Sequence, residues 1–248
     1  MLNHLMGQLP NASEHGYLID SNLEFCHWIM LLLFAGWGTF FVFTLIRFHH
    51  SRNPTANYHG VRSHISSHVE FSVVLVEIIL LFGFAYPLWA RRVNDYPSDK
   101  ENPVKIRVIA QQFQWKFHYP GKDGIFGKSD ASLLNSGNPL GLDPNDPNGN
   151  DDIYSPNELH LPVNRPVILE ITSMDVIHSF SFPAMRIAQD AIPGMRTPIW
   201  FKPVKIGQYQ IICGQLCGTG HYNMKADVVV QSEEDYEAWL KDNDPTKQ

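Results

Sequence analysis

Two long apolar stretches constrain this chain more than any other feature of its sequence. Residues 25–46 contain no Asp, Glu, Lys or Arg, and residues 71–90 contain a single charge, Glu77. A helix needs about 20 apolar residues to cross a bilayer, so both stretches are long enough. Two helices buried in a globular core would show a regular polar stripe, and neither stretch does. The pattern predicts a transmembrane helix hairpin, with spans at about 24–47 and 69–91 in an N-terminal part that extends to residue 96.

The charges around these stretches predict the orientation of the hairpin. An even number of spans places both termini on one side of the membrane. The connector holds three arginines and no acid before Glu70, so it is expected on the cytoplasmic side and the termini outside. Arg91 and Arg92, which follow the second span, oppose this assignment. No basic run precedes an early apolar core, so a cleaved signal peptide is not expected.

Residues 97–248 are predicted to form an extramembrane domain of short strands. Runs such as ELHLPV, PVILEITS and KADVVVQS alternate in polarity between Pro, Gly, Asn or Asp, which is typical of antiparallel strands in a sandwich or barrel. An insertion rich in Asp, Asn, Pro and Gly, at about 121–157, is expected to be a surface loop. Calcium is an alternative role for its acids, although they do not follow EF-hand spacing. A short helix capped by Ser232 is expected at about 233–241.

The segment CGQLCGTGHYNM, near the C-terminus, carries the most specific chemistry. Of three cysteines, Cys26 lies in the first span, and Cys213 and Cys217 lie here. A disulfide between these two would close a very small loop and would leave His221 and Met224 unexplained. Structural zinc takes Cys and His ligands, and methionine matches it poorly. Thiolate, imidazole and thioether together favour copper.

The number of thiols favours two copper ions over one. A mononuclear blue-copper site uses one Cys, two His and a weak Met, whereas two thiolates can bridge two ions, each of which needs an imidazole. His178, at the end of a predicted strand, fits the second imidazole better than His118 or His160, which lie within alternating strand patterns. A site without an open position suits electron transfer. The expected ligands are His178, Cys213, the carbonyl of Gln215, Cys217, His221 and Met224.

Several elements of the chain together resemble a known family. They are the helix hairpin, QQFQWKFHYPG, DVIHSF, QDAIPGM and the C-x3-C-x3-H-x2-M loop, and they resemble cytochrome c oxidase subunit II of the haem–copper oxidases over nearly the whole chain. The resemblance implies a transmembrane hairpin followed by an all-β, cupredoxin-like sandwich of Greek-key type with a binuclear CuA copper centre. It further implies the electron-transfer subunit of an oxidoreductase and translocase. That subunit accepts electrons from cytochrome c and passes them to haem in subunit I, where O2 is reduced to water with proton translocation.

The resemblance also assigns roles to residues outside the copper loop. The family's aromatic motif has two tryptophans, the first of which receives the electron; here Phe113 stands at the first position and Trp115 at the second. Glu70 matches a carboxylate at the mouth of a proton channel. Many members have Glu at the position of Gln215, where it helps to bind magnesium at the subunit interface. Gln lacks the charge, which puts that ion in question.

The net charge of the domain and the absence of a haem-attachment motif indicate which partners to expect. From Pro97 onward the chain has 14 Lys or Arg and 19 Asp or Glu, a net of −5, which suits a basic cytochrome c; Asp175 and Asp190 flank the copper region. No C-x-x-C-H occurs, so the donor haem belongs to a separate cytochrome c or to a c-type haem domain of another subunit. Subunits I and III and membrane lipid are further expected partners, and nucleic acid is not. The expected location is a bacterial inner membrane or equivalent respiratory membrane, with the copper domain on the outer, periplasmic side.

Two other classes of protein share part of this pattern. A quinol oxidase subunit II has the hairpin and the sandwich but lacks the copper ligands. A membrane-tethered copper-delivery protein would bind one copper through exposed Cys or Met residues and would need neither the aromatic segment nor Glu70. The complete ligand set favours the CuA-containing subunit, and the number of coppers per chain separates all three classes.

Overall fold

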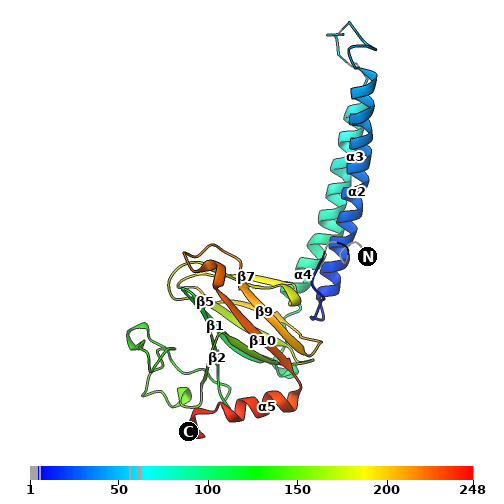
Figure 1. Cartoon of the computed structure of the whole chain (residues 1–248). Coiled ribbons are helices and arrows are strands. Elements are labelled where there is room, and N and C mark those ends of the chain that lie inside the picture. Colours follow the sequence, from blue (N-terminus) through cyan, green and yellow to red (C-terminus); the bar gives the residue numbers. More distant parts are fainter. Residues whose placement is uncertain (1–4, 6, 56, 61–62, 248) are drawn as a thin grey trace. The chain divides into compact units, whose positions relative to one another are not determined.

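A computed structural model describes residues 5, 7–55, 57–60 and 63–247 of the 248-residue chain. The chain forms two compact units. One comprises residues 1–8 and 18–95, and the other comprises residues 9–17 and 96–248. The two units are visible in Figure 1 as a helix hairpin and a β-rich domain.

The first unit consists of two long apolar helical segments. Helix α2 spans Gly16–Arg47, and the second segment runs through α3, Ile65–Leu80, the π-helical turn η1, Leu81–Ala85, and α4, Tyr86–Asn94. Both segments are long and apolar enough to cross a membrane, and the most apolar window of each is not buried within the protein. Exposed apolar surface of this extent is unfavourable in water and favourable in lipid. The protein is therefore membrane-anchored. Helix α2 begins before the predicted first span and ends with it at Arg47, whereas the second segment extends beyond its predicted span at both ends.

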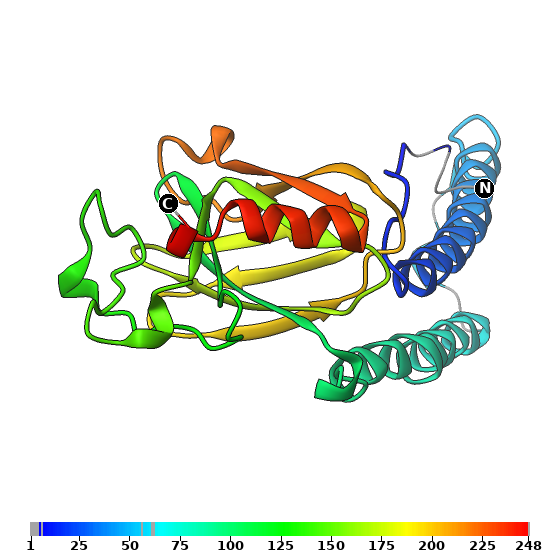
Figure 2. The same ribbon diagram turned by 90° about the horizontal axis from the view of Figure 1, so that it is seen from below.

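The second unit is a sandwich of two five-stranded sheets, with strand orders β3-β2-β1-β5-β8 and β4-β10-β9-β6-β7. Figure 2 shows these sheets from below, with helix α5 across them. The strands are β1 Val104–Gln111, β2 Gln114–Tyr119, β3 Ile153–Pro156, β4 Glu158–Pro162, β5 Val167–Ser173, β6 His178–Phe182, β7 Ile187–Ala191, β8 Thr197–Phe201, β9 Gly207–Cys213 and β10 Lys225–Gln231. Short 3-10 turns occur at η2 Asp99–Glu101, η3 Ala131–Leu133, η4 Pro147–Gly149, η5 Pro183–Met185, η6 His221–Asn223 and η7 Pro245–Lys247. The predicted all-β sandwich is confirmed.

The pairing of the strands differs from the expected antiparallel pattern in two places. Strand β1 pairs with β5 in parallel, and β4 pairs with β10 in parallel. A parallel pair needs a long crossover connection, and the strands between each pair provide one. Polarity alternation along a single strand is the same in both kinds of pair, so the sequence pattern could not separate them.

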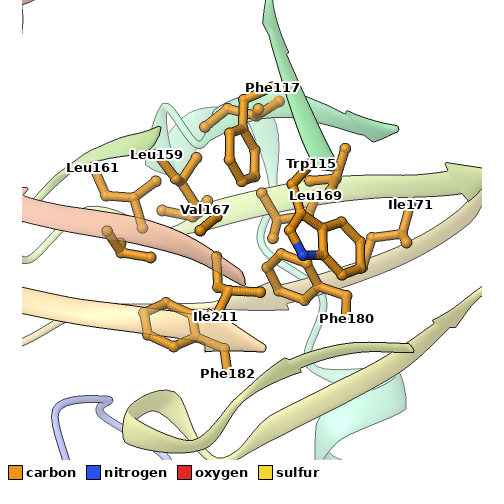
Figure 3. Close-up of a cluster of buried hydrophobic side chains, with 14 of the residues drawn as sticks. Trp115, Phe117, Leu159, Leu161, Val167, Leu169, Ile171, Phe180, Phe182 and Ile211 are labelled. Carbon is orange, nitrogen blue, oxygen red and sulfur yellow. The ribbon is translucent and has the colours of Figure 1, made fainter. Parts of the chain in front are cut away.

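The core lies between the two sheets and contains large side chains from both. Trp115, Phe117, Phe180 and Phe182 are among the fully buried residues, and Figure 3 shows them packed with aliphatic side chains of β4, β5 and β9. Fully burying a large apolar side chain contributes about 1.5–3 kcal/mol. Alternation along β6 turns His178 to the same buried face as Phe180 and Phe182. The core therefore supports one of the predicted copper ligands directly.

A segment near the N-terminus, residues 9–17, belongs to the β-domain. The amide of Ala12 donates to the carbonyl of Ala184 at 2.8 Å, and the amide of Val204 donates to the carbonyl of Ala12 at 2.8 Å. Ser13 Oγ also donates to the carbonyl of Met185 at 2.9 Å. The sequence assigned this segment to the membrane part. These hydrogen bonds make residues 9–17 part of the β-domain.

The insertion and the C-terminal helix flank the sandwich. The last residues of the expected 121–157 loop, 153–156, form strand β3, which pairs with β2. Helix α5 spans Glu233–Asp242, and Ser232 accepts a hydrogen bond from the amide of Asp235 at its start. Trp239 of α5 stacks on His160 of β4 with ring centroids 4.3 Å apart. This contact fixes α5 on the sandwich.

Candidate metal centre

The predicted copper loop joins two neighbouring strands of one sheet. Strand β9 ends at Cys213, β10 begins at Lys225, and the two strands pair antiparallel. The amide of Cys213 donates to the carbonyl of Met224 at 3.0 Å, so the first and last ligands of the loop meet at the end of this ladder. The ladder thereby closes the loop at its base. Strand β6, which starts at His178, lies on the other side of β9.

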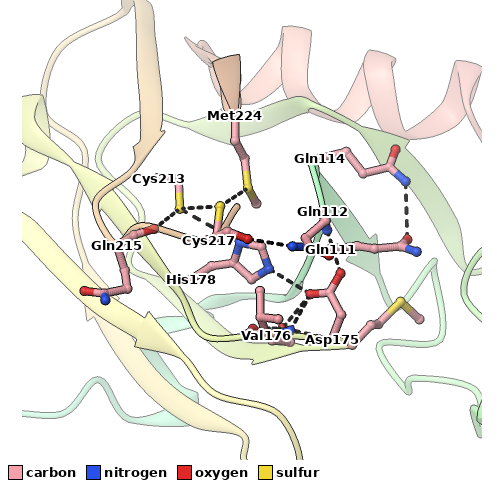
Figure 4. Close-up of polar contacts among 12 residues, drawn as sticks. Gln111, Gln112, Gln114, Asp175, Val176, His178, Cys213, Gln215, Cys217 and Met224 are labelled. Atoms are coloured by element: carbon pink, nitrogen blue, oxygen red, sulfur yellow. Dashed lines mark hydrogen bonds and ion pairs between the residues drawn. The ribbon is translucent and has the colours of Figure 1, made fainter. Parts of the chain in front are cut away.

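The donor atoms converge in two sets around the two thiols. Cys213 Sγ lies 3.9 Å from His178 Nδ1 and 3.2 Å from the carbonyl oxygen of Gln215. Cys217 Sγ lies 3.6 Å from His221 Nδ1 and 3.8 Å from Met224 Sδ. The two sulfurs are 3.8 Å apart, and Figure 4 shows most of this arrangement. Each thiol thus has an imidazole of its own and one further donor.

The site is shielded from water, and its thiols carry no disulfide. His178 is fully buried, and Cys213, Cys217 and Met224 are at most 7% exposed, whereas His221 is half-buried. Burial and the neighbouring Cys213 raise the pKa of Cys217 to about 11. A metal ion that binds here must therefore displace a proton from Cys217. Among the residues that the structure describes, His178, Cys213 and Cys217 are the only group of three or more His, Cys, Asp or Glu whose ligand atoms converge for a metal ion.

Asp175 orients the buried imidazole. His178 Nε2 lies 2.8 Å from Asp175 Oδ1, which leaves Nδ1 directed toward the sulfurs. Burial raises the pKa of this carboxyl, but hydrogen bonds from Gln112, His178 and Val176 outweigh burial, and the net pKa of Asp175 is lowered. A carboxylate behind a metal-binding histidine fixes the tautomer and the ring orientation. The sequence had suggested Asp175 only as a surface charge near the copper region; its spacing of three residues from His178 is the signal for this closer role.

The two aromatic residues predicted to receive electrons lie at different depths. Phe113 is 37% exposed and lies against Gly218 and Gly220 of the copper loop. Trp115 is fully buried, with its ring edge-on to His178 at a centroid distance of 6.2 Å. Both therefore adjoin the ligands, one on the surface and one in the core. Leu216 and Tyr222 of the loop are strongly exposed.

Of the other candidate residues, His118, His160 and Glu70 lie outside the ligand set. His118 pairs with Asp152 at 2.6 Å beneath the insertion, and His160 stacks on Trp239, so neither joins the ligand set. The side chain of Gln215 points to solvent while its carbonyl faces Cys213. Glu70 is an exposed residue of α3 in the other unit.

Comparisons with known proteins identify the family of this chain. Residues 104–232 match the family described as cytochrome c oxidase subunit II, periplasmic domain. The alternative cytochrome c oxidase subunit 2 of Bradyrhizobium diazoefficiens is 36% identical over 94% of this chain and 82% of its own length. Cytochrome c oxidase subunit 2 of Cereibacter sphaeroides is 30% identical over 87% of this chain and 75% of its own. The crystal structure of the periplasmic domain of subunit II of cytochrome oxidase from Bradyrhizobium japonicum covers 56% of this chain and 92% of that one, with 29% identity and a TM-score of 0.42. The chain belongs to the cytochrome c oxidase subunit II family.

Proposed function

We propose that the chain is the electron-transfer subunit of a respiratory cytochrome c oxidase. In this proposal it accepts electrons from cytochrome c at a binuclear copper centre and passes them to haem in subunit I. Reduction of O2 to water and the coupled proton translocation take place in that partner. The observation that carries the proposal is the pair of buried thiols 3.8 Å apart, each with its own imidazole.

The donor set fits copper. Soft thiolate and thioether ligands favour copper, and Met224 distinguishes the set from the Cys and His ligands of structural zinc. The division into two sets around Cys213 and Cys217 supports two ions over one. The residues that would hold them are His178, Cys213, the carbonyl of Gln215, Cys217, His221 and Met224. Bound there, a copper pair would take up and release single electrons.

The surrounding residues favour electron transfer over catalysis. The ligands lie at the ends of β6 and β9 and in the loop between β9 and β10, and the core residues behind them restrict movement when the charge of the centre changes. A site whose ligands move little meets a small reorganisation barrier. Burial of the thiols excludes water, and the ligand set leaves no position for a substrate. These features support a role as a conductor of electrons.

The surface beside the loop supports docking of the donor. We propose that a cytochrome c, or a c-type haem domain, contacts the apolar surface of Phe113, Leu216 and Tyr222 and that electrons enter through Phe113 and Trp115. The domain's net charge of −5 from Pro97 onward favours a basic partner and raises the rate of encounter.

Other parts of the proposal rest on the family resemblance. Subunit I would accept the electrons, subunit III and lipid would surround the hairpin, and Glu70 would lie at the mouth of a proton channel. The copper domain would face the periplasm of a bacterial inner membrane or its equivalent. A magnesium ion at the interface with subunit I would lack a carboxylate from Gln215.

Copper content and spectroscopy of the full chain in detergent test the proposal. We expect two coppers per chain, a purple colour and an electron paramagnetic resonance (EPR) spectrum with the hyperfine pattern of one electron shared between two copper nuclei. Colourless protein without bound copper would indicate a subunit of the quinol oxidase class. One copper per chain would indicate a copper-delivery protein. Either result would contradict the proposal.

A further inference from the structure

Gln112 lies beside the metal centre without supplying a ligand. It follows the end of β1 and precedes β2; its side chain contacts the ligand residue Cys217, and its main chain contacts Asp175, the partner of His178. Its amide Nε2 donates to the carbonyl of Cys217 at 2.6 Å, although the two residues are 105 positions apart. Its main-chain N–H donates to Asp175 Oδ2 at 2.7 Å. We infer that Gln112 is a positioning residue that ties the imidazole side of the copper centre to its thiol side.

The hydrogen bonds form one continuous path between two ligands. His178 Nε2 meets Asp175 Oδ1 at 2.8 Å, Asp175 Oδ2 accepts from the Gln112 main chain, and the Gln112 side chain reaches Cys217. Figure 4 shows the path from His178 through Asp175 and Gln112 to Cys217. Because strand β6 carries one end and the copper loop the other, this path fixes the separation of two ligands on different elements.

The close packing of the loop supports the same conclusion. Gly218 has φ of +136°, and a Cβ at this position would lie 2.8 Å from Gln112 Nε2. A Cβ at Gly220 would overlap the ring of Phe113. The loop therefore lies directly on residues 112–113, and glycine permits this approach at both positions. A change at Gln112 would be transmitted to Cys217 through this contact.

Main-chain hydrogen bonds hold the copper loop on either side of Cys217, whereas the carbonyl of Cys217 is held by a side chain from another segment. The amide of Gly214 donates to the carbonyl of Ser179, and that of His221 donates to the carbonyl of Gly218, so the two ends of the loop are held by backbone bonds. Cys217 lies between these bonds and carries the thiol that is close to Cys213, His221 and Met224. Its anchor is the side chain of Gln112. Preorganised ligands hold a metal more tightly and in a more uniform geometry.

Substitution of Gln112 in the full chain tests this inference, which rests on the proposed copper site. Gln112→Met keeps the length of the side chain but has no donor, and Gln112→Glu keeps its shape but, when ionised, has no proton to donate. Gln114→Met is the matched control, because among the described residues the side chain of Gln114 hydrogen-bonds only to the nearby Gln111, at 3.4 Å. Both Gln112 variants leave the main-chain bond to Asp175 in place. Three quantities are measured at neutral pH: the EPR spectrum, the rate at which a chelator removes copper, and the melting temperature of the copper-free chain.

We expect both Gln112 variants to lose copper about tenfold faster than the wild type, as the loss of one good hydrogen bond predicts. Their copper hyperfine pattern should change, whereas Gln114→Met should match the wild type in both the rate of copper loss and the hyperfine pattern. Wild-type rates and spectra in both Gln112 variants would overturn the inference. A lower melting temperature with an unchanged spectrum would also overturn it, since the residue would then act only on folding. Failure of the wild-type chain to bind a copper pair would instead overturn the proposed function.

Discussion

Two irregular segments of the β-domain have the composition of metal-binding loops, and they use their polar groups in opposite ways. In the copper loop, the thiols of Cys213 and Cys217 and the ring of His221 face one another. In the insertion, the carboxylates bind the backbone of the insertion itself. Asp130 accepts from the amide of Ser132 at 2.7 Å, and Asp146 accepts from the amide of Lys128 at 2.8 Å.

The difference teaches that ligand type does not make a site unless the donors converge. Hydrogen bonds from backbone amides lower the pKa of Asp146, and hydrogen bonds from Ser132 lower that of Asp130. These carboxylates are therefore ionised, and their oxygens already accept hydrogen bonds from the backbone. Calcium needs six to eight oxygens around one point, whereas these oxygens are distributed along the loop. The copper loop keeps its donors together because β9, β10 and the base of β6 bring three chain segments to one place.

The largest expected effect concerns the thiols. Cys217→Ser removes a donor that contacts Cys213, His221 and Met224, so the shared-electron EPR spectrum should disappear and copper content should fall below two per chain. Cys26→Ser, in helix α2, is the matched control and should leave the spectrum unchanged. A Cys217→Ser chain with the wild-type spectrum would show that the wrong cysteine has been assigned.

The next effect concerns the one buried acid of the insertion that also pairs with a side chain. Asp152 Oδ2 lies 2.6 Å from His118 Nε2 and accepts from the amide of Gly127 at 2.8 Å. Asp152→Ala leaves both donors without this partner, which should cost about 1–3 kcal/mol in the free energy of unfolding. Chemical denaturation measures it, and the copper spectrum should not change. Asp143→Ala, which removes a local bond to the amide of Asn145, should cost less.

A smaller effect should appear in the stability of the folded state at low pH. Lys122, in the insertion, and Thr246 donate to Asp244 and lower the pKa of this carboxyl to about 2. The folded state therefore gains stability from Asp244 above its ordinary pKa of about 4, and this gain is lost as the pH falls from about 4 to about 2. The melting temperatures of the wild type and Asp244→Asn should differ at neutral pH and converge toward pH 2. A gap that stays constant across this range would contradict the assignment. Lys122→Met should reproduce most of the gap.

The smallest expected effect is that of calcium. Because the acids of the insertion bind backbone amides, millimolar calcium should leave the melting temperature of the full chain unchanged once ionic strength is matched with magnesium. A calcium-specific rise, abolished by Asp146→Asn, would show that the insertion rearranges into a cation site. That result would remove the contrast between the two loops.

Much of the copper loop could be predicted because its information is local. Cys213, Cys217, His221 and Met224 lie within twelve residues, and their chemistry limits the metal. His178 could be chosen because a strand end places a side chain at the edge of the core. The pairing of Asp175 with His178 has a local signal in their spacing of three residues, whereas Gln112 as the partner of Cys217 could not be predicted, because that contact joins residues 105 positions apart.

The sequence by itself determined the apolar hairpin, the alternating strands and the identity of the sulfur and imidazole donors, since these follow from short-range periodicity and from side-chain chemistry. Only the tertiary structure decided which strands pair in parallel, that residues 9–17 join the β-domain, and that the acids of the insertion bind their own backbone. Such contacts join residues far apart in the chain, and no local pattern encodes the packing of two sheets that brings them together. The 105 residues between Gln112 and Cys217 illustrate this limit.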